Sequence, residues 1–199
     1  MFLFTEPSSS IIAQFLTDRE ADDFSYPEVG ATATDAPRGF TVDHNRTKLG
    51  RGRSAYERAC AAIERWEMFN IGWVKLLPTY TPIEVGRNVA ILIRHFGFYS
   101  LNSARIVYTL DEDGDVERRG FAYGTLTEHG EIGEERFSVE FYRESEEVWY
   151  DLYAFSRPGM LLAKIGYPLG RYLQRAFAAD SKLAMLNAVS PPPKGKGPA

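Results

Sequence analysis

The chain has 199 residues, of which 44% are hydrophobic and 14% aromatic, which is enough to build one domain with a substantial core. Its formal net charge of -4 argues against nucleic acid as a partner, because no excess of basic residues is available to neutralise phosphates. The one cysteine, Cys60, excludes an internal disulfide, suits a reducing compartment, and is more typical of a small core residue than of a nucleophile.

The N-terminal segment, residues 1–23, is expected to be an arm that carries one short helix. Ser8–Ser10 could cap this helix, and apolar residues follow at helical spacing within Ile11–Leu16. The segment lacks the basic region of a signal peptide, and no stretch of the chain approaches the roughly 20 apolar residues of a membrane span. We therefore expect a cytoplasmic protein without stable membrane insertion. Residues 24–37 contain Pro and Gly breakers, which predict a loop.

The first strand is expected at residues 40–48, followed by a turn at residues 49–53, which read LGRGR. Ser54 and Glu57 match a capping box, so a helix is predicted from Ser54 to about residue 68. Two glycines and two arginines before a helix start could also hold a phosphate. The motif lacks most of a P-loop, so we favour a plain turn.

A series of short segments rich in β-branched and aromatic residues follows, which is typical of an antiparallel sheet. The acidic run DEDGD at residues 111–115 predicts a hairpin turn, since it lacks the length and the terminal Glu of a calcium loop. Strands are expected at residues 73–77, 88–96, 104–110, 121–126, 137–142 and 148–155.

The last helix is predicted over residues 159–189. Ser156 is a plausible cap for it, and Pro158 stands at a position that the first helical turn tolerates. Pro168 should kink this helix or split it in two. Residues 190–199, which read SPPPKGKGPA, have the composition of a disordered tail.

The stretch from Phe121 to Phe137, FAYGTLTEHGEIGEERF, joins an aromatic strand to a charged turn. Gly124 inside the strand indicates a bulge or the close approach of another group. His129 lies among several acids, and one interpretation is an acid–base site, because a His of near-neutral pKa stands beside carboxylates. The other interpretation is a hairpin whose loop carries solvated charges. No metal-ligand spacing is present here, so we expect no metal site.

The order of these elements predicts an α+β fold, a curved antiparallel sheet gripping a long C-terminal helix. A single antiparallel sheet needs a cover for its apolar face, and the last helix is the one element long enough. We place this domain at residues 24–189, between the arm and the tail. The space between a curved sheet and a helix suits a small apolar ligand, unless the chain's own Phe and Tyr side chains fill it.

At this point the sequence resembles uncharacterised protein family 0548, a domain-of-unknown-function family. The resemblance covers nearly everything between residues 24 and 189, and it implies a helix-grip fold of the START/SRPBCC kind without implying a reaction. Six blocks in order carry it: YPEVGAT at residues 26–32, LGRG at 49–52, MFNIGWV at 68–74, FAYGTLTEH at 121–129, GEERF at 133–137 and WYDLYAFSRP at 149–158.

The first functional hypothesis is a protein that binds a small hydrophobic or lipid-like molecule between sheet and helix, with no cofactor. Arg94 and His95 are neighbours in a strand and face opposite sides, so at most one of them points inward. The candidate ligand-binding residues are Tyr123, Arg94, Tyr150, Ser156 and Arg157.

The second hypothesis is a cyclase- or hydrolase-like enzyme that uses the same cavity. His129 would be the general base, and Glu134 or Glu135 would orient it. Arg136 or Tyr123 would stabilise charge that develops on the substrate. No G-x-S-x-G motif or other nucleophile motif supports covalent catalysis.

The third hypothesis is a protein-interaction module with a filled core, in which the N-terminal helix docks a partner. Its contact face would be Ile11, Ile12, Phe15 and Leu16. The alternative, which we favour, is that this helix packs on its own domain. The sequence sets neither the oligomeric state nor the identity of a ligand.

Overall fold

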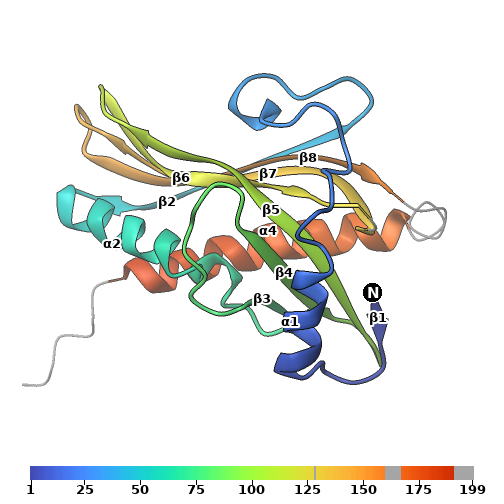
Figure 1. Cartoon of the computed structure of the whole chain (residues 1–199). Coiled ribbons are helices and arrows are strands. Elements are labelled where there is room, and N and C mark those ends of the chain that lie inside the picture. Colours follow the sequence, from blue (N-terminus) through green and yellow to red (C-terminus); the bar gives the residue numbers. More distant parts are fainter. Residues whose placement is uncertain (128, 160–166, 191–199) are drawn as a thin grey trace, which may run out of the picture.

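The structure is a computed structural model that describes residues 1–127, 129–159 and 167–190. Its main feature is a curved antiparallel sheet that wraps around the C-terminal helix (Figure 1). The helices are α1 (Ser9–Thr17), α2 (Arg53–Glu64) and α4 (Tyr167–Val189), with two short 3-10 turns, η1 (Ala31–Ala33) and η2 (Glu67–Phe69). The strands are β1 (Phe2–Leu3), β2 (Thr41–Arg51), β3 (Val74–Leu77), β4 (Asn88–Arg94), β5 (Tyr99–Glu112), β6 (Val116–Thr125), β7 (Glu131–Tyr142) and β8 (Glu147–Pro158).

The sheet has eight strands in the order β2-β8-β7-β6-β5-β4-β3, and β1 pairs with β5. All strand pairs in the described residues are antiparallel, and hairpins join the consecutive strands from β3 to β8. The helices α2 and α4 lie on the concave face (Figure 1). The predicted α+β fold, a curved antiparallel sheet gripping a long C-terminal helix, is confirmed.

The main core lies between the concave face and these two helices. Phe121 and Phe137 are fully buried there, and their rings stack with centroids 5.4 Å apart. Tyr150 is also fully buried, and its hydroxyl lies 2.8 Å from that of Ser181 on α4. This hydrogen bond satisfies a polar group that would otherwise be buried without a partner.

The convex face is crossed by residues 24–37, the segment that runs over the sheet at the top of Figure 1. Tyr26 and Thr32 of this segment are buried against the sheet, and both bond to the Glu134 carboxylate. A Cβ atom at Gly124 would lie 2.1 Å from the Tyr26 hydroxyl. The close approach that Gly124 predicts is therefore confirmed, and the approaching group is Tyr26.

The helix predicted after Ser8 is confirmed as α1, and the Ser8 hydroxyl accepts a hydrogen bond from the Ile11 N–H. Phe15 is buried, and it packs on Ala90 and Leu92 of β4, on the face of that strand opposite the main core. The helix therefore packs on its own domain.

The start of α2 differs from the sequence prediction. The strand β2 continues through Arg51, so most of LGRGR is strand, and Gly52 is the N-cap of α2 with no side-chain cap hydrogen bond. The capping box predicted from Ser54 and Glu57 is wrong, because the helix already begins at Arg53. Gly52 has φ +82°, a conformation that disfavours other residues and ends the strand sharply.

The end of β8 is a second correction. Ser156, Arg157 and Pro158 do not start a helix; they are the last residues of β8, where Ser156 pairs with Thr41 on β2 and with Gly133 on β7. Neighbouring strands on both sides supply backbone hydrogen bonds, and these outweigh the local helix-start pattern. The kink expected at Pro168 depends on residues 160–166, which, like the tail from residue 191, lie outside the described residues.

Candidate ligand-binding cavity

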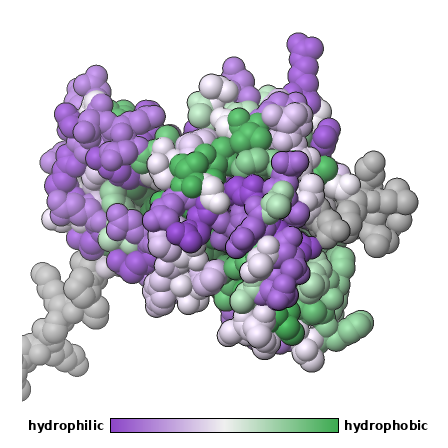
Figure 2. All heavy atoms as spheres, viewed as in Figure 1, coloured by the Kyte–Doolittle hydropathy of each residue, from purple (hydrophilic) through white to green (hydrophobic). Residues whose placement is uncertain are grey.

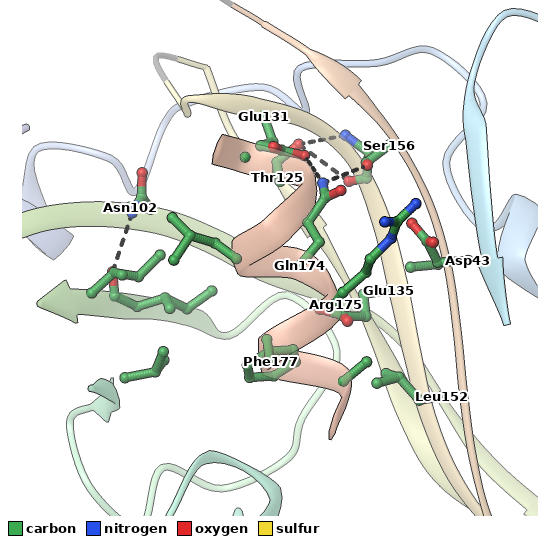
Figure 3. A pocket seen from close by; sticks show the side chains of 18 of the residues that line it. Asp43, Asn102, Thr125, Glu131, Glu135, Leu152, Ser156, Gln174, Arg175 and Phe177 are labelled. Atoms are coloured by element: carbon green, nitrogen blue, oxygen red, sulfur yellow. Dashed lines mark hydrogen bonds between the residues drawn. The ribbon is translucent and has the colours of Figure 1, made fainter. Parts of the chain in front are cut away.

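A cavity of about 690 Å³ lies between the concave face of the sheet and α4. Figure 3 shows the polar groups Glu131, Ser156 and Gln174 gathered at one end, with Leu152 and Phe177 further along the helix. The apolar wall includes Phe69, Val74, Ile91, Ile93, Leu152 and Phe177, and the polar lining includes Asn102, Thr125, Glu131, Glu135, Ser156 and Gln174.

The strand register places Tyr123, Glu135 and Asp43 in one row across the concave face. Tyr123 on β6 is opposite Glu135 on β7, Glu135 is opposite Ala154 on β8, and Ala154 is opposite Asp43 on β2. Residues directly opposite each other share a face of the sheet, so all four side chains point toward α4. The Tyr123 hydroxyl donates a hydrogen bond of 2.6 Å to a Glu135 carboxylate oxygen.

The Glu135 carboxyl is held in an environment that disfavours its charge. Burial raises its pKa to about 7, against the opposing effect of the Tyr123 hydrogen bond. The nearby carboxylates Asp43 and Glu131 raise that pKa further. Glu135 therefore exchanges its proton near neutral pH, directly on the cavity wall.

The polar end of the cavity joins α4 to the sheet. Gln174 donates hydrogen bonds to the Glu131 carboxylate and to the Ser156 hydroxyl, the latter at 3.0 Å. One turn earlier on α4, both terminal nitrogens of Arg171 donate to Asp43, at 2.5 and 2.7 Å. This bidentate geometry fixes the start of α4 against β2.

His129 lies in the turn between β6 and β7 and lines the cavity. Its Nδ1 accepts a hydrogen bond of 3.0 Å from the Glu131 N–H, so in the neutral ring the proton is on Nε2. Burial lowers the His129 pKa to about 4, and the ring is neutral at pH 7. In this state His129 can donate a hydrogen bond from Nε2, while the Nδ1 lone pair already accepts one from the Glu131 N–H.

The structure does not bring the predicted catalytic group His129, Glu134 and Arg136 together. Glu134 borders the cavity, but its carboxylate accepts hydrogen bonds from Tyr26, Gly30 and Thr32 on the convex side. Arg136 is on that side too, where it donates to the Thr32 carbonyl at 2.7 Å and to Asp151 at 3.1 Å. Alternation along β7 places these two residues on the face away from His129.

The five predicted ligand-binding residues also divide between the two faces. Tyr123 and Ser156 line the cavity, and Tyr150 is buried in the core beneath it. Arg94 ends β4 and is not part of the lining. Arg157 is on the convex face, with its guanidinium 4.5 Å from the centre of the Phe40 ring.

The sequence reasoning passed over Asp43 and Gln174, considered Glu131 only as one of the acids beside His129, and considered Glu135 only as an alternative to Glu134. A signal for Glu135 was available, because it has the same strand parity as Phe137 and so the same inward direction. No local signal could have found Gln174, since its partners Glu131 and Ser156 are set by the packing of α4.

Two other sequence motifs are engaged in structural contacts. Arg53 in the proposed phosphate loop donates two hydrogen bonds of 2.6 Å to the Glu117 carboxylate, and Arg51 donates to the Ser145 carbonyl. Burial raises the pKa of the Cys60 thiol to about 11, so the thiolate is not formed at neutral pH. In the described parts of the chain, no three His, Cys, Asp or Glu side chains are grouped to hold a metal.

The fold and the cavity define a helix-grip protein, in which a curved antiparallel sheet encloses one face of a long helix. A family model described as a domain of unknown function, DUF1990, matches residues 25–184. The chain belongs to this family of UPF0548 proteins, as the six sequence blocks indicated. None of the helices in the described residues is long and apolar enough to cross a membrane.

Relatives of the chain occur in eukaryotes and bacteria. A UPF0548 protein of Dictyostelium discoideum is 38% identical over 208 residues, which cover 95% of this chain and 96% of that protein. A UPF0548 protein of Deinococcus radiodurans is 35% identical over 203 residues, which cover 95% of this chain and 99% of that protein.

Among solved structures, the chain is similar to a norcoclaurine synthase of Thalictrum flavum in complex with a transition-state analogue. That match has a TM-score of 0.46 and 12% identity, and covers 78% of this chain and all (100%) of the other. Human STARD10 matches with a TM-score of 0.39 and 9% identity, over 95% of this chain and 91% of the other. Similarities this distant say nothing of the ligand or the activity of this chain.

Proposed function

We propose that this protein binds one small, largely apolar molecule with a polar end in the cavity between the sheet and α4. The observation that supports this proposal is the cavity itself, whose volume of about 690 Å³ is in the range of small-molecule sites. Most of the accessible surface of its lining is apolar, and the polar groups Glu131, Ser156 and Gln174 gather at one end.

Leaving a space of this size between the sheet and α4 gives up packing contacts that would otherwise stabilise the fold. Interiors are close-packed, and each cavity in a core lowers the free energy of unfolding. Phe69 and Phe177 line the cavity and leave it open, although aromatic side chains of their size could fill it. Retention of the space is therefore consistent with an occupant.

The test is to purify the protein from its host and compare its native and denaturing mass spectra. We expect a mass excess that vanishes on denaturation, and fluorescence enhancement when the neutral probe N-phenyl-1-naphthylamine is added to delipidated protein.

A matched pair of variants localises the probe: Ala154 points into the cavity and Tyr153 points away from it on the same strand. Ala154→Trp should weaken probe binding at least roughly tenfold by filling the space, and Tyr153→Trp should not. Absence of both the mass excess and the fluorescence change would exclude the proposal.

A second candidate function is acid–base catalysis on a molecule in the same cavity. It is favoured by one observation, the Glu135 carboxyl with a pKa of about 7 beside the Tyr123 hydroxyl. In this version Glu135 takes the role of general base that the sequence assigned to His129. A co-purified molecule that changes mass on incubation with wild-type protein, and does so roughly 100-fold more slowly with Glu135→Gln, would establish an enzyme. A molecule returned unchanged would establish a carrier.

His129→Ala tests the enzyme version that the sequence predicted, with His129 as the general base. In a carrier, His129→Ala removes one hydrogen-bond donor from the lining, so the variant should fold and keep most of its probe affinity. In an enzyme that uses His129 as its base, the same variant should bind substrate and lose roughly 100-fold or more in rate.

A further inference from the structure

The Glu135 carboxylate lies on the cavity wall without a positively charged side chain paired with it in the described residues. In the described part of the chain, its carboxylate has one hydrogen-bond partner, the Tyr123 hydroxyl at 2.6 Å, and no ion pair. Burying a carboxylate without a counter-charge is unfavourable, and the buried acidic side chains Glu117, Glu140 and Asp151 of the sheet are each paired with an arginine. Glu117, for example, bonds to Arg53 and Arg143.

The basic side chains that α4 brings to this side of the sheet leave Glu135 uncompensated. Arg171 directs both terminal nitrogens to Asp43. Lys182 places its ammonium 3.5 Å from the Asn45 side-chain oxygen, and the Arg175 side chain is exposed at the rim of the cavity. Among the described residues, no cation contributes to the shift of the Glu135 pKa.

The other titratable groups around Glu135 are acidic or neutral. Tyr123 on β6 and Tyr150 on β8 are phenols whose pKa burial raises well above the usual value, so they stay neutral. Asp43 on β2 and Glu131 on β7 are carboxyls, and both raise the Glu135 pKa. No cation is among the groups that shift the Glu135 pKa, so this carboxyl favours a cationic partner.

Resting on the proposed function, we infer that the molecule bound in the cavity is a hydrophobic amine, whose protonated nitrogen pairs with the Glu135 carboxylate. The Tyr123 hydroxyl occupies one side of that carboxylate, which leaves the second oxygen for the ligand. The apolar part of the ligand then lies along Phe69 and Phe177, toward the apolar wall.

Ligands of other charge fit the wall less well. An apolar carboxylate would meet carboxyls of its own sign at Glu135 and Glu131, whereas Arg171 already balances the charge of Asp43. A neutral alcohol can donate one hydrogen bond to Glu135 but brings no charge to balance it. A protonated amine supplies both, so it should bind best of a series with the same apolar group.

The experiment is displacement of N-phenyl-1-naphthylamine by three competitors that share one apolar group: 2-(2-naphthyl)ethylamine, 2-(2-naphthyl)ethanol and 3-(2-naphthyl)propanoate. At about pH 8 we expect the amine to compete at least roughly tenfold more tightly than the alcohol, and the carboxylate to compete most weakly. In Glu135→Gln the amine should lose its advantage while the alcohol keeps its affinity. The matched control is Glu140→Gln, on the same strand but with its side chain on the convex face, bonded to Arg46 and Arg118.

The pH dependence gives a readout that a merely structural role of Glu135 would not produce. The ethylamine stays protonated throughout, so its affinity should rise with pH while free Glu135 ionises, and become constant above about pH 7. Tyr123→Phe removes a hydrogen bond that lowers the Glu135 pKa, so the plateau should move to higher pH. The affinity of the alcohol should show neither change.

Two results would overturn the inference and leave the proposed function intact: equal affinity for amine and alcohol in the wild type, or an amine preference that survives in Glu135→Gln. Both require that the probe binds. A wild-type protein that binds neither the probe nor any of the three competitors, measured directly by native mass spectrometry, would instead overturn the proposed function and this inference with it.

Discussion

Glu134 and Glu135 are neighbours in sequence with opposite surroundings. Glu134 is buried on the convex face, where hydroxyl and backbone donors of residues 26–32 surround its carboxylate. Glu135 points into the cavity, where the Tyr123 hydroxyl is its one hydrogen-bond partner among the described residues. The period of two along a strand is enough to give these carboxyls different roles, one structural and one available to a ligand.

For Glu134 we predict a large loss of stability on truncation. Its carboxylate accepts from the Tyr26 hydroxyl at 2.6 Å, the Gly30 N–H at 2.7 Å and the Thr32 N–H at 2.9 Å. Glu134→Ala leaves these donors buried without a partner, so the free energy of unfolding in urea should fall by about 3 kcal/mol. Cleavage of residues 24–37 by a protease should also become faster. Glu28→Ala, an exposed position in the same segment, is the control, and equal stability of the two variants would contradict the prediction.

For Glu135 we predict a dependence of stability on pH. Because burial raises its pKa from 4.5 to about 7, the folded state holds this proton more tightly than the unfolded state. Between about pH 4.5 and pH 7 the unfolded chain therefore releases the proton first, and stability falls as the pH rises. The Glu135 contribution lost between about pH 5 and pH 8 is on the order of 2 kcal/mol.

Glu135→Gln tests this dependence, because it keeps an acceptor for Tyr123 and cannot ionise. Urea unfolding at about pH 5 and pH 8 should show a difference smaller by about 2 kcal/mol in the variant than in the wild type. Glu20→Gln, at an exposed position of the arm, should leave the difference unchanged. An unaltered pH dependence in Glu135→Gln would mean that Glu135 ionises equally in both states.

At the scale of elements, the segment 24–37 and the helix α4 hold opposite faces of the sheet. The segment attaches through Tyr26 and Thr32, and α4 attaches through Arg171, Gln174 and Ser181. Each attachment joins residues far apart in the chain, so each is a tertiary contact that secondary structure alone does not imply.

Gly124 marks the tightest point of the convex attachment. A methyl group there would lie 2.1 Å from the Tyr26 hydroxyl, so Gly124→Ala must displace the ring that bonds to Glu134. We predict a loss of about 1–3 kcal/mol in the free energy of unfolding, with faster proteolysis of residues 24–37. Gly114→Ala is the matched control, because its nearest contact is 3.8 Å, to the Val116 carbonyl oxygen. Equal urea midpoints for the two variants would show that Tyr26 is not held as described.

At the scale of the whole molecule, the cavity links ligand binding to stability, because its wall is built by both the sheet and α4. A ligand that binds only the folded state at a concentration of 100 times its Kd adds about 2.7 kcal/mol. For a protein of this size that corresponds to a rise in Tm of roughly 5–10 °C. We predict such a rise with saturating N-phenyl-1-naphthylamine, measured by circular dichroism, and a much smaller one in Ala154→Trp. Equal shifts in the two proteins would place the probe outside the cavity.

Local patterns in the sequence indicated each of the strands β3 to β8, though with other bounds than the structure has, since β7 begins at Glu131 and was expected from residue 137. They also indicated the helix α1 with its Ser8 cap and the shared face of Phe121 and Phe137. The six blocks also identified the family. These features were readable because strand alternation, helix spacing and capping act over a few residues, and a single chain displays them directly.

The tertiary structure alone decided where strands end and which polar groups meet. Ser156 has a helix-cap pattern and became strand, because β2 and β7 supply partners for its backbone on both sides. Asp43 meets Arg171, and Glu134 meets Tyr26, across more than 100 residues of chain, at separations of 128 and 108. Such pairings follow from the sheet register and from the position of α4 against the sheet. Both depend on the packing of the whole core rather than on any local spacing in the sequence.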